Sequence, residues 1–357
     1  MDFDVSDFFP NASMGLKNIG FFFGAGTSRK AGYPLMPSLT KDVLQKINSD
    51  DLEILGDLVT RSLAIQIDVA NGTPNIEEIS DVLESALLII DRNDPKYLKF
   101  NDIRNQIREK IFESLQITTP DFSDHVRFFN ALSRIFSGKS ETIWIFTLNY
   151  DLLFEIAASK VKVPLFNGFV GTSLRFFNNQ SFHYSIGTIE GIQFHNYRNP
   201  IFKIMKLHGS LDWWKCDNSV FSTENRNYLS TSSQRVMVLP RKKKMSETLD
   251  SPYNDIFRYS DRILGSQCKY LVSCGYSYGD EHINDTLLLP KVQQNKIKLT
   301  ALVKDEPQNF KKFNLHNSFS YGTETSIKKN NRVEESGTEL WQFEKFVDLL
   351  HEYAGLE

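Results

Sequence analysis

Short apolar runs that end in glycine or in small and polar residues recur along this chain. The first, residues 18–23, is aromatic and leads directly into Gly24, which predicts a fully buried strand. Further strands are predicted at residues 142–151, 201–210, 235–240, 270–280 and 298–303. Because ligands of an open parallel sheet bind at the carboxyl ends of its strands, we expect the polar residues that end several of these runs to converge.

Residues 38–136 follow a different pattern, because their apolar residues recur at helical spacing. The stretches with this spacing are residues 38–47, 51–67, 75–90, 103–117 and 122–136. They predict a helical insertion or subdomain. Near the end of the sequence, residues 321–337 are polar, which favours a flexible loop, and residues 338–356 have the pattern of an amphipathic helix.

These patterns predict an α/β fold, with a Rossmann-like parallel sheet and a helical subdomain. We expect four segments along the 357 residues. They are residues 1–37 as the first part of the nucleotide-binding core, 38–136 as the helical subdomain, 137–320 as the remainder of the core, and 321–357 as the loop and C-terminal helix.

Composition and charge argue against several classes of protein. The formal net charge is −3, whereas a general nucleic-acid binder is usually basic, so direct contact with nucleic acid is not expected and the basic run 241–245 is interpreted as a solvated loop. Three cysteines without a C-x-x-C pair predict neither a disulfide framework nor a zinc knuckle, and favour a reducing, cytoplasmic compartment. The N-terminus lacks the pattern of a signal peptide, and no apolar run approaches the length of a membrane span.

The candidate chemistry begins with a glycine-rich run directly after the first predicted strand. It consists of Gly24, Ala25, Gly26, Thr27 and Ser28. The two glycines let the backbone approach a pyrophosphate, and the two hydroxyls can cap a helix N-terminus that faces it. Arg29 occupies the third glycine position of the G-x-G-x-x-G fingerprint, and no G-K-[ST] follows, so neither standard nucleotide motif is present. On its own, the run is equally typical of a tight strand-to-helix turn.

Three later runs decide between these interpretations. They are residues 147–151 (TLNYD), 206–210 (KLHGS) and 274–285 (CGYSYGDEHIND). With the glycine-rich run and the following Gly32–Pro34, they resemble the motifs of the sirtuin fold in their order: a G-A-G-x-S loop with G-x-P, a T-x-N-x-D cluster, an H-G histidine and a glycine–serine ribose loop. The resemblance covers residues 18–34 and 142–303 and implies a site for NAD+.

The resemblance implies roles for individual residues. Asn149 and His208 take the catalytic positions: the Asn149 amide orients the attacking water, and His208 acts as the general base, either through the ribose hydroxyls or directly on water. The residues expected to bind NAD+ are Gly24, Ala25, Gly26, Thr27, Ser28, Asp151, Gly275 and Ser277. For Asp151, the alternative is that it simply holds the loop. The roles of Asp280, Glu281 and His282 stay open.

The sequence departs from the sirtuins that deacylate proteins. Their zinc ribbon needs four cysteines in two close pairs, which Cys216, Cys268 and Cys274 do not provide, so no metal is expected. The run LMPSLT also replaces the Asp-Phe-Arg that those sirtuins place after G-x-P. GYSYGDEHIN resembles the sirtuin-like proteins of bacterial defence against phage. This implies an NAD+ hydrolase, for which NAD+ is the substrate and nicotinamide and ADP-ribose are the products.

The same resemblance implies partners. We expect a homo-oligomer activated in trans, with a HerA-type ATPase or another protein as the activating partner, and no attachment to a membrane. Two other functions stay open. One is an NAD-dependent protein deacylase, against which the missing zinc pattern counts. The other is a sensor that binds an ADP-ribose-like nucleotide without turnover, against which the presence of Asn149 and His208 counts.

Overall fold

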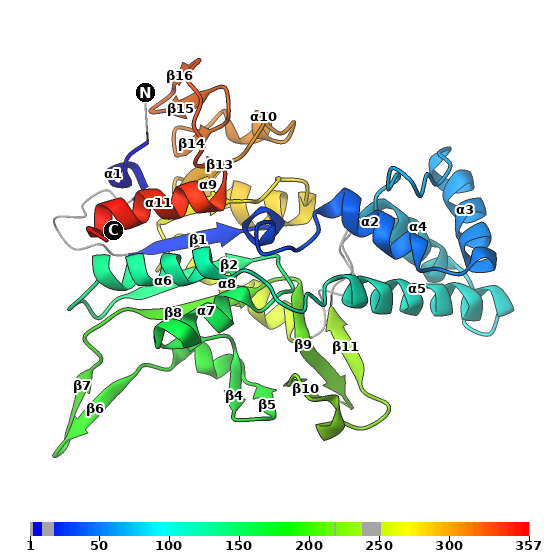
Figure 1. Ribbon diagram of the computed structural model, residues 1–357, viewed down its shortest axis with the longest axis horizontal. Coiled ribbons are helices and arrows are strands. Elements are labelled where there is room, and N and C mark those ends of the chain that lie inside the picture. Colours follow the sequence, from blue (N-terminus) through cyan, green and yellow to red (C-terminus); the bar gives the residue numbers. More distant parts are fainter. Residues whose placement is uncertain (1–2, 9–17, 218, 238–250, 357) are drawn as a thin grey trace.

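Among the residues that the structure describes, a mixed sheet of nine strands forms the centre of the molecule (Figure 1). The computed structural model describes residues 3–8, 18–217, 219–237 and 251–356. In sheet order the strands are β16 (Arg332–Glu334), β15 (Ile327–Lys329), β14 (Phe319–Gly322), β13 (Lys298–Leu302), β12 (Tyr270–Cys274), β1 (Ile19–Phe23), β2 (Thr142–Thr147), β8 (Ile201–Lys206) and β3 (Leu165–Phe166). The pairings from β14 to β3 are parallel, which confirms the predicted α/β fold with a Rossmann-like parallel sheet.

The strand order places a topological switch point beside β1. From β1 the chain forms β2, then the edge strand β3, and then β8 between these two, before it returns to the other side of β1 to form β12. The last residues of the two neighbours, Phe23 and Cys274, are paired in register. The loops after β1 and β12 therefore start side by side, at the edge where open α/β sheets bind ligands.

The alternating side chains of β1 divide between two hydrophobic cores. Phe21 and Phe23 face a cluster that includes α6 (Ser123–Ile135), α7 (Leu153–Val161) and α11 (Phe343–Ala354). Phe22 faces the opposite cluster, which includes α8 (Tyr253–Ile263), η6 (Ile283–Leu288), α9 (Leu289–Gln293) and α10 (Phe310–Phe313). Because both faces are covered, the strand is apolar at every position except its glycine, as the sequence indicated.

Four of the predicted helices form a group of their own. They are α2 (Met36–Gln45), α3 (Ser49–Leu63), α4 (Ile76–Ile89) and α5 (Pro95–Ser114). They share a third hydrophobic cluster and lie at the right of Figure 1, where the arrow of β1 points toward them. The fifth predicted helix, α6, instead packs on the sheet beside α11. The helices themselves are confirmed, whereas the division of the chain into domains stays a prediction.

A second sheet follows the central strands. Sequence analysis predicted the strand 235–240, which coincides with β11 up to residue 237 and then leaves the described residues, but it did not predict the sheet. Its antiparallel strands, in sheet order, are β11 (Gln234–Met237), β9 (Gly209–Cys216), β10 (Ser219–Ser222), β5 (Arg175–Phe177) and β4 (Phe169–Gly171). β6 (Gly187–Glu190) and β7 (Gln193–Asn196) form a separate hairpin that extends away from the body of the molecule (Figure 1). The chain passes from the central sheet to the second sheet through Leu207 and His208, which join β8 directly to β9.

The structure changes one prediction near the C-terminus. Residues 321–337 do not form only a loop, because β15 and β16 pair as an antiparallel hairpin that extends the central sheet from β14. The prediction of a closing amphipathic helix is confirmed by α11. The basic run 241–245 lies outside the described residues. Within the described residues, no helix is both long and apolar enough to cross a membrane.

Candidate functional site

The glycine-rich run forms a tight turn that packs against the loop after β12. Residues Ala25–Ser28 form the short helix η2, and the Gly26 amide donates a hydrogen bond of 2.9 Å to the Gly275 carbonyl. A Cβ atom on Gly24 would lie 2.6 Å from the Gly275 oxygen, and one on Gly26 would lie 2.6 Å from its Cα. Because these neighbours are backbone atoms, the two loops can approach so closely only if Gly24 and Gly26 have no side chain.

Asn149 joins this turn to the loop after β2. Its Nδ2 group lies within hydrogen-bond distance of the Gly24 carbonyl (3.1 Å), Thr27 Oγ1 (3.1 Å) and Ser28 Oγ (2.9 Å). An amide nitrogen carries two hydrogens, so it can donate to two of these three acceptors at a time. The amide nitrogen of Asn149 thus fixes the turn, and the side chain, which also carries the acceptor Oδ1, is buried.

Asp151 holds the same turn from a second direction. Ser28 Oγ donates a hydrogen bond of 2.7 Å to Asp151 Oδ2, and the Leu153 amide donates one of 3.1 Å to Oδ1. The second bond places the carboxylate at the start of α7, where the helix dipole favours a negative charge. Burial, and then the charge of Asp151, raise the pKa of Tyr33 well above its usual value. Asp151 therefore supports the turn.

A buried lysine lies under the loop that carries Asn149 and Asp151. Lys206 Nζ donates to the carbonyl oxygens of Tyr150 (3.2 Å) and Asp151, and lies 3.3 Å from Glu155 Oε1. Burial raises the pKa of Glu155, while the Lys206 ammonium acts on it in the opposite direction. Sequence analysis did not identify Lys206. The signal was available, because a lysine in the apolar run IFKIMK needs buried acceptors.

His208 lies on the other side of the loop after β2. Its ring centroid is 6.3 Å from that of Tyr150, the residue between Asn149 and Asp151. Gly209 follows with a φ of +90°, so the chain turns sharply from β8 into β9 directly after the histidine. His208 Nε2 lies 3.1 Å from Asp280 Oδ2. The structure thus gives Asp280, whose role the sequence left open, a contact with the predicted base.

The residues predicted to bind NAD+ do not all contact one another. Gly275 touches the glycine-rich turn, as described above, and its φ of +67° lets the chain bend at the end of β12. Ser277 is exposed, and its Oγ accepts a hydrogen bond of 3.4 Å from the Gly279 amide within its own loop. Ala25 is also exposed. The central cluster therefore consists of the two glycine loops and Asn149, with Asp151 beneath them.

Comparison with known protein families found a similarity for one segment of the chain. Residues 144–313 match the family model described as SIR2-like domain. This segment is thus similar to SIR2-like domains. The match supports the sirtuin-like fold predicted from the motifs and fits a sirtuin-type function that uses NAD+. It contains Asn149, His208 and Gly275, whereas the glycine-rich turn lies before it.

The comparisons with solved structures and with curated proteins gave the following results. A solved structure, titled "Structure of Sir2Tm bound to a propionylated peptide", is 12% identical to this chain, with a TM-score of 0.38. The similarity covers 96% of this chain and 95% of that one. No curated protein matches the chain.

The cysteines of the SIR2-like segment are separate. Burial raises the pKa of the Cys268 and Cys274 thiols well above the usual value, and Cys216 lies apart on β9. Among the described residues, no group of three or more His, Cys, Asp and Glu side chains is arranged to hold a metal ion. That the protein works without a metal stays a prediction.

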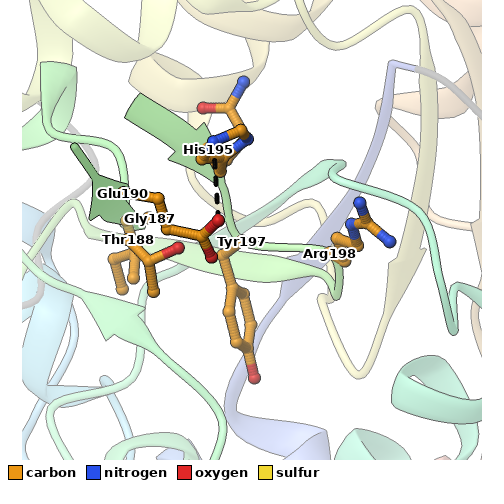
Figure 2. Close-up of a pocket in the computed structure, with 8 residues that line it drawn as sticks. Gly187, Thr188, Glu190, His195, Tyr197 and Arg198 are labelled. Carbon is orange, nitrogen blue, oxygen red and sulfur yellow. Dashed lines mark ion pairs between the residues drawn. The ribbon is translucent and has the colours of Figure 1, made fainter. Parts of the chain in front are cut away.

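A pocket of about 350 Å³ lies elsewhere, beside the β6–β7 hairpin (Figure 2). Its lining residues are Ile186, Gly187, Thr188, Glu190, His195, Asn196, Tyr197 and Arg198. The dashed line in Figure 2 joins His195 to Glu190, whose nearest nitrogen and oxygen are 3.9 Å apart. None of the predicted site residues lines this pocket, so it is separate from the cluster around the glycine-rich turn.

Proposed function

We propose that the protein hydrolyses NAD+ to nicotinamide and ADP-ribose. The observation that carries this proposal is the cluster at the switch point: the glycine-rich turn, held by Asn149, lies beside the loop whose Tyr150 contacts His208. A backbone turn that can approach a pyrophosphate and a buried histidine are thus close together, at the edge of the sheet where α/β folds bind nucleotides.

The proposed reaction needs one water and no further reactant. The water oxygen bonds to C1′ of the ribose next to nicotinamide, and the bond from C1′ to the nicotinamide nitrogen breaks. Both electrons of that bond go to the nitrogen, so nicotinamide leaves as a neutral molecule. His208 accepts a proton from the water and later releases it to solvent. Asn149 Oδ1 orients the water, since Nδ2 of the same amide is occupied with the turn.

A chromatographic assay tests the proposal. The purified protein, alone and together with its natural partners, is incubated with NAD+, with and without an acetyl-lysine peptide, and nicotinamide and ADP-ribose are quantified. We expect both products without peptide. Nicotinamide released only with the peptide, together with an acetylated ADP-ribose, would instead identify a protein deacylase. Binding of ADP-ribose without release of nicotinamide in either incubation would identify a sensor.

We further propose a cellular setting, which rests on the sequence resemblance. The protein is a triggered effector that depletes NAD+ in the cytoplasm during bacterial defence against phage. It is a homo-oligomer that restrains the site until a HerA-type ATPase or another partner acts on it. Light scattering of the purified protein, alongside the NAD+ assay, tests this setting. A monomer that hydrolyses NAD+ at full rate unaided would contradict it.

A further inference from the structure

A buried pair formed by His208 and Asp280 stands out among the polar contacts of the molecule. His208 Nε2 and Asp280 Oδ2 are 3.1 Å apart, and the two side chains are only 9% and 6% exposed. Water screens such a pair poorly, so a hydrogen bond from imidazole to carboxylate is stronger here than on a surface. The pair joins the turn between β8 and β9 to the loop after β12, and its two residues are 72 positions apart in the sequence.

The backbone around Asp280 fixes its carboxylate. Oδ1 accepts a hydrogen bond of 3.1 Å from the Ile283 amide, and the Asp280 carbonyl accepts bonds from the Asn284 amide (3.0 Å) and the Tyr276 hydroxyl (3.3 Å). One carboxylate oxygen therefore caps the helical run that continues into η6, and the other lies toward His208. Rotation of the carboxylate would break the cap, so its orientation toward the imidazole is maintained.

We infer that Asp280 is a positioning residue for His208 in the proposed hydrolysis. It accepts the Nε2 hydrogen of the neutral imidazole, and so determines which tautomer is present and how the ring is oriented. When His208 takes the proton from water, the carboxylate balances the charge of the imidazolium. This inference rests on the proposed function for its catalytic meaning, but the contact itself has consequences that can be measured without turnover.

Other titratable groups near the pair belong to several elements. They are Tyr150 and Asp151 on the loop after β2, Lys206 on β8, Tyr276 on the loop after β12, and Glu77 on α4, whose charge acts on Tyr276. Replacing Asp280 by asparagine leaves all of these side chains in place, and the one pKa among them that the Asp280 charge acts on, that of Tyr276, lies far above neutral pH. Their influence on His208 is therefore common to the parent and the variant, and a difference between the two reports the Asp280 charge.

Nuclear magnetic resonance of histidine labelled with ¹⁵N tests the contact directly. In the parent protein, the signal assigned through the loss of one histidine in His208→Gln should show neutral His208 protonated on Nε2. In Asp280→Asn, the asparagine Oδ1 can still cap Ile283, but the negative charge is gone. The pKa of His208 should then fall by about one unit or more. Asp285→Asn is the matched control, because Asp285 is exposed and pairs with Lys312.

Kinetics test the catalytic meaning of the contact. In Asp280→Asn, kcat for NAD+ cleavage should fall about tenfold or more with little change in KM, and the acidic limb of the pH profile should move to lower pH. Asp280→Glu keeps the charge and should recover part of kcat. Asp285→Asn should behave like the parent.

The outcomes separate the inference from the proposed function. If His208 carries its proton on Nδ1 in the parent, or keeps its pKa in folded Asp280→Asn, the inference is overturned whether or not NAD+ is cleaved. The parent spectrum decides this even if the variant does not fold. If the expected tautomer and shift are found but the parent never cleaves NAD+, the proposed function fails while the His208–Asp280 contact stands.

Discussion

In the proposed reaction, Asn149 combines a structural and a chemical task in one side chain. Its Nδ2 group holds Gly24, Thr27 and Ser28, and in the proposed reaction its Oδ1 orients the water. The two tasks depend on each other, because the same amide fixes the turn that we propose as the pyrophosphate site. A loss of Asn149 should therefore weaken NAD+ binding as well as slow the chemistry.

We predict that Asn149→Ala and His208→Ala each nearly abolish NAD+ hydrolysis while the fold is kept. Misplacement of a reactant costs about a hundredfold, and loss of a general base costs about a hundred- to ten-thousandfold. Because both residues serve one transition state, the double variant should lose much less than the product of the two single losses. Single-turnover kinetics and circular dichroism check this. If folded His208→Ala turns over NAD+ at the parent's rate, the histidine is not the base.

His125 shows how burial alone sets the behaviour of a histidine. Its ring lies on α6 between Phe154 and Phe343, with centroid distances of 4.7 and 4.9 Å, and neither ring nitrogen has a hydrogen-bond partner. Burial lowers its pKa from 6.5 to about 4, although the nearby carboxylates, Asp151 first among them, act in the opposite direction. We attribute no chemistry to this histidine.

The second prediction follows from that low pKa. Below pH 6.5 the unfolded chain binds a proton at His125 and the folded chain does not, so stability falls as the pH drops from 6.5 to about 4. His125→Phe should remove this contribution, which amounts to about 3 kcal/mol at pH 4 and below, and should keep NAD+ cleavage at pH 7. Urea unfolding of both proteins between pH 7 and 4 measures it. Parallel curves for the two would show that His125 is not buried as described.

Among the elements, the contact between the two glycine loops is the least tolerant of change. Gly26→Ala would place a Cβ atom 2.6 Å from the Gly275 backbone, so the loops must separate. We predict a loss of about 1–3 kcal/mol in the free energy of unfolding and a marked rise in KM for NAD+. Thermal unfolding and initial-rate kinetics check both effects.

Gly56→Ala is the matched control for this prediction. Gly56 lies inside α3, and an added Cβ atom would meet no other atom within 4 Å. Alanine there should stabilise the protein by up to about 1 kcal/mol and leave NAD+ cleavage unchanged. Equal destabilisation by the two alanines would show that the close approach of the loops is not what makes Gly26 necessary.

The sequence predicted those elements whose signals are local. Strands such as β1 and β12 are short apolar runs, and α2 to α6 have helical spacing, so both can be recognised from neighbouring residues. Most of the second sheet was not predicted, because β4 and β5 have only three residues each and join the rest of the sheet through β10, which is distant in the sequence. β15 and β16 were not predicted because they are polar and short.

In the candidate site, too, only the local signals could be recognised from the sequence. The order of the motifs identified Asn149 and His208 as candidates, and the structure places both around the loop after β2. The contact of His208 with Asp280, and the support of the loop by Lys206, join residues that are 72 and 55 positions apart. Pairings of this kind depend on the strand order, which no local pattern in one sequence specifies.

At the scale of the whole molecule, the helical group is connected to the site through Tyr150. This residue belongs to the hydrophobic cluster of α2 to α5, and its ring also lies 6.3 Å from that of His208. Arg235 on β11 makes a second connection: its guanidinium carbon lies 3.1 Å from the ring centre of Phe112 on α5 and 4.1 Å from that of Trp214 on β9. The helical group and the second sheet are thus joined by a stacked arginine.

The last prediction concerns this connection. Arg235→Lys keeps the positive charge but loses the flat group that stacks between the two rings, so Arg235→Lys and Arg235→Ala should both loosen α5 from β9. We expect faster hydrogen exchange at backbone amides of α5, with β1 and β2 protected as in the parent, because those strands lie in separate cores. Mass spectrometry of exchanged peptides measures this. Exchange in α5 that stays at the parent's rate in both variants would show that the hydrophobic cluster alone holds the helical group. Faster exchange in α5 accompanied by altered NAD+ cleavage would identify the helical group as a route by which a trigger reaches His208.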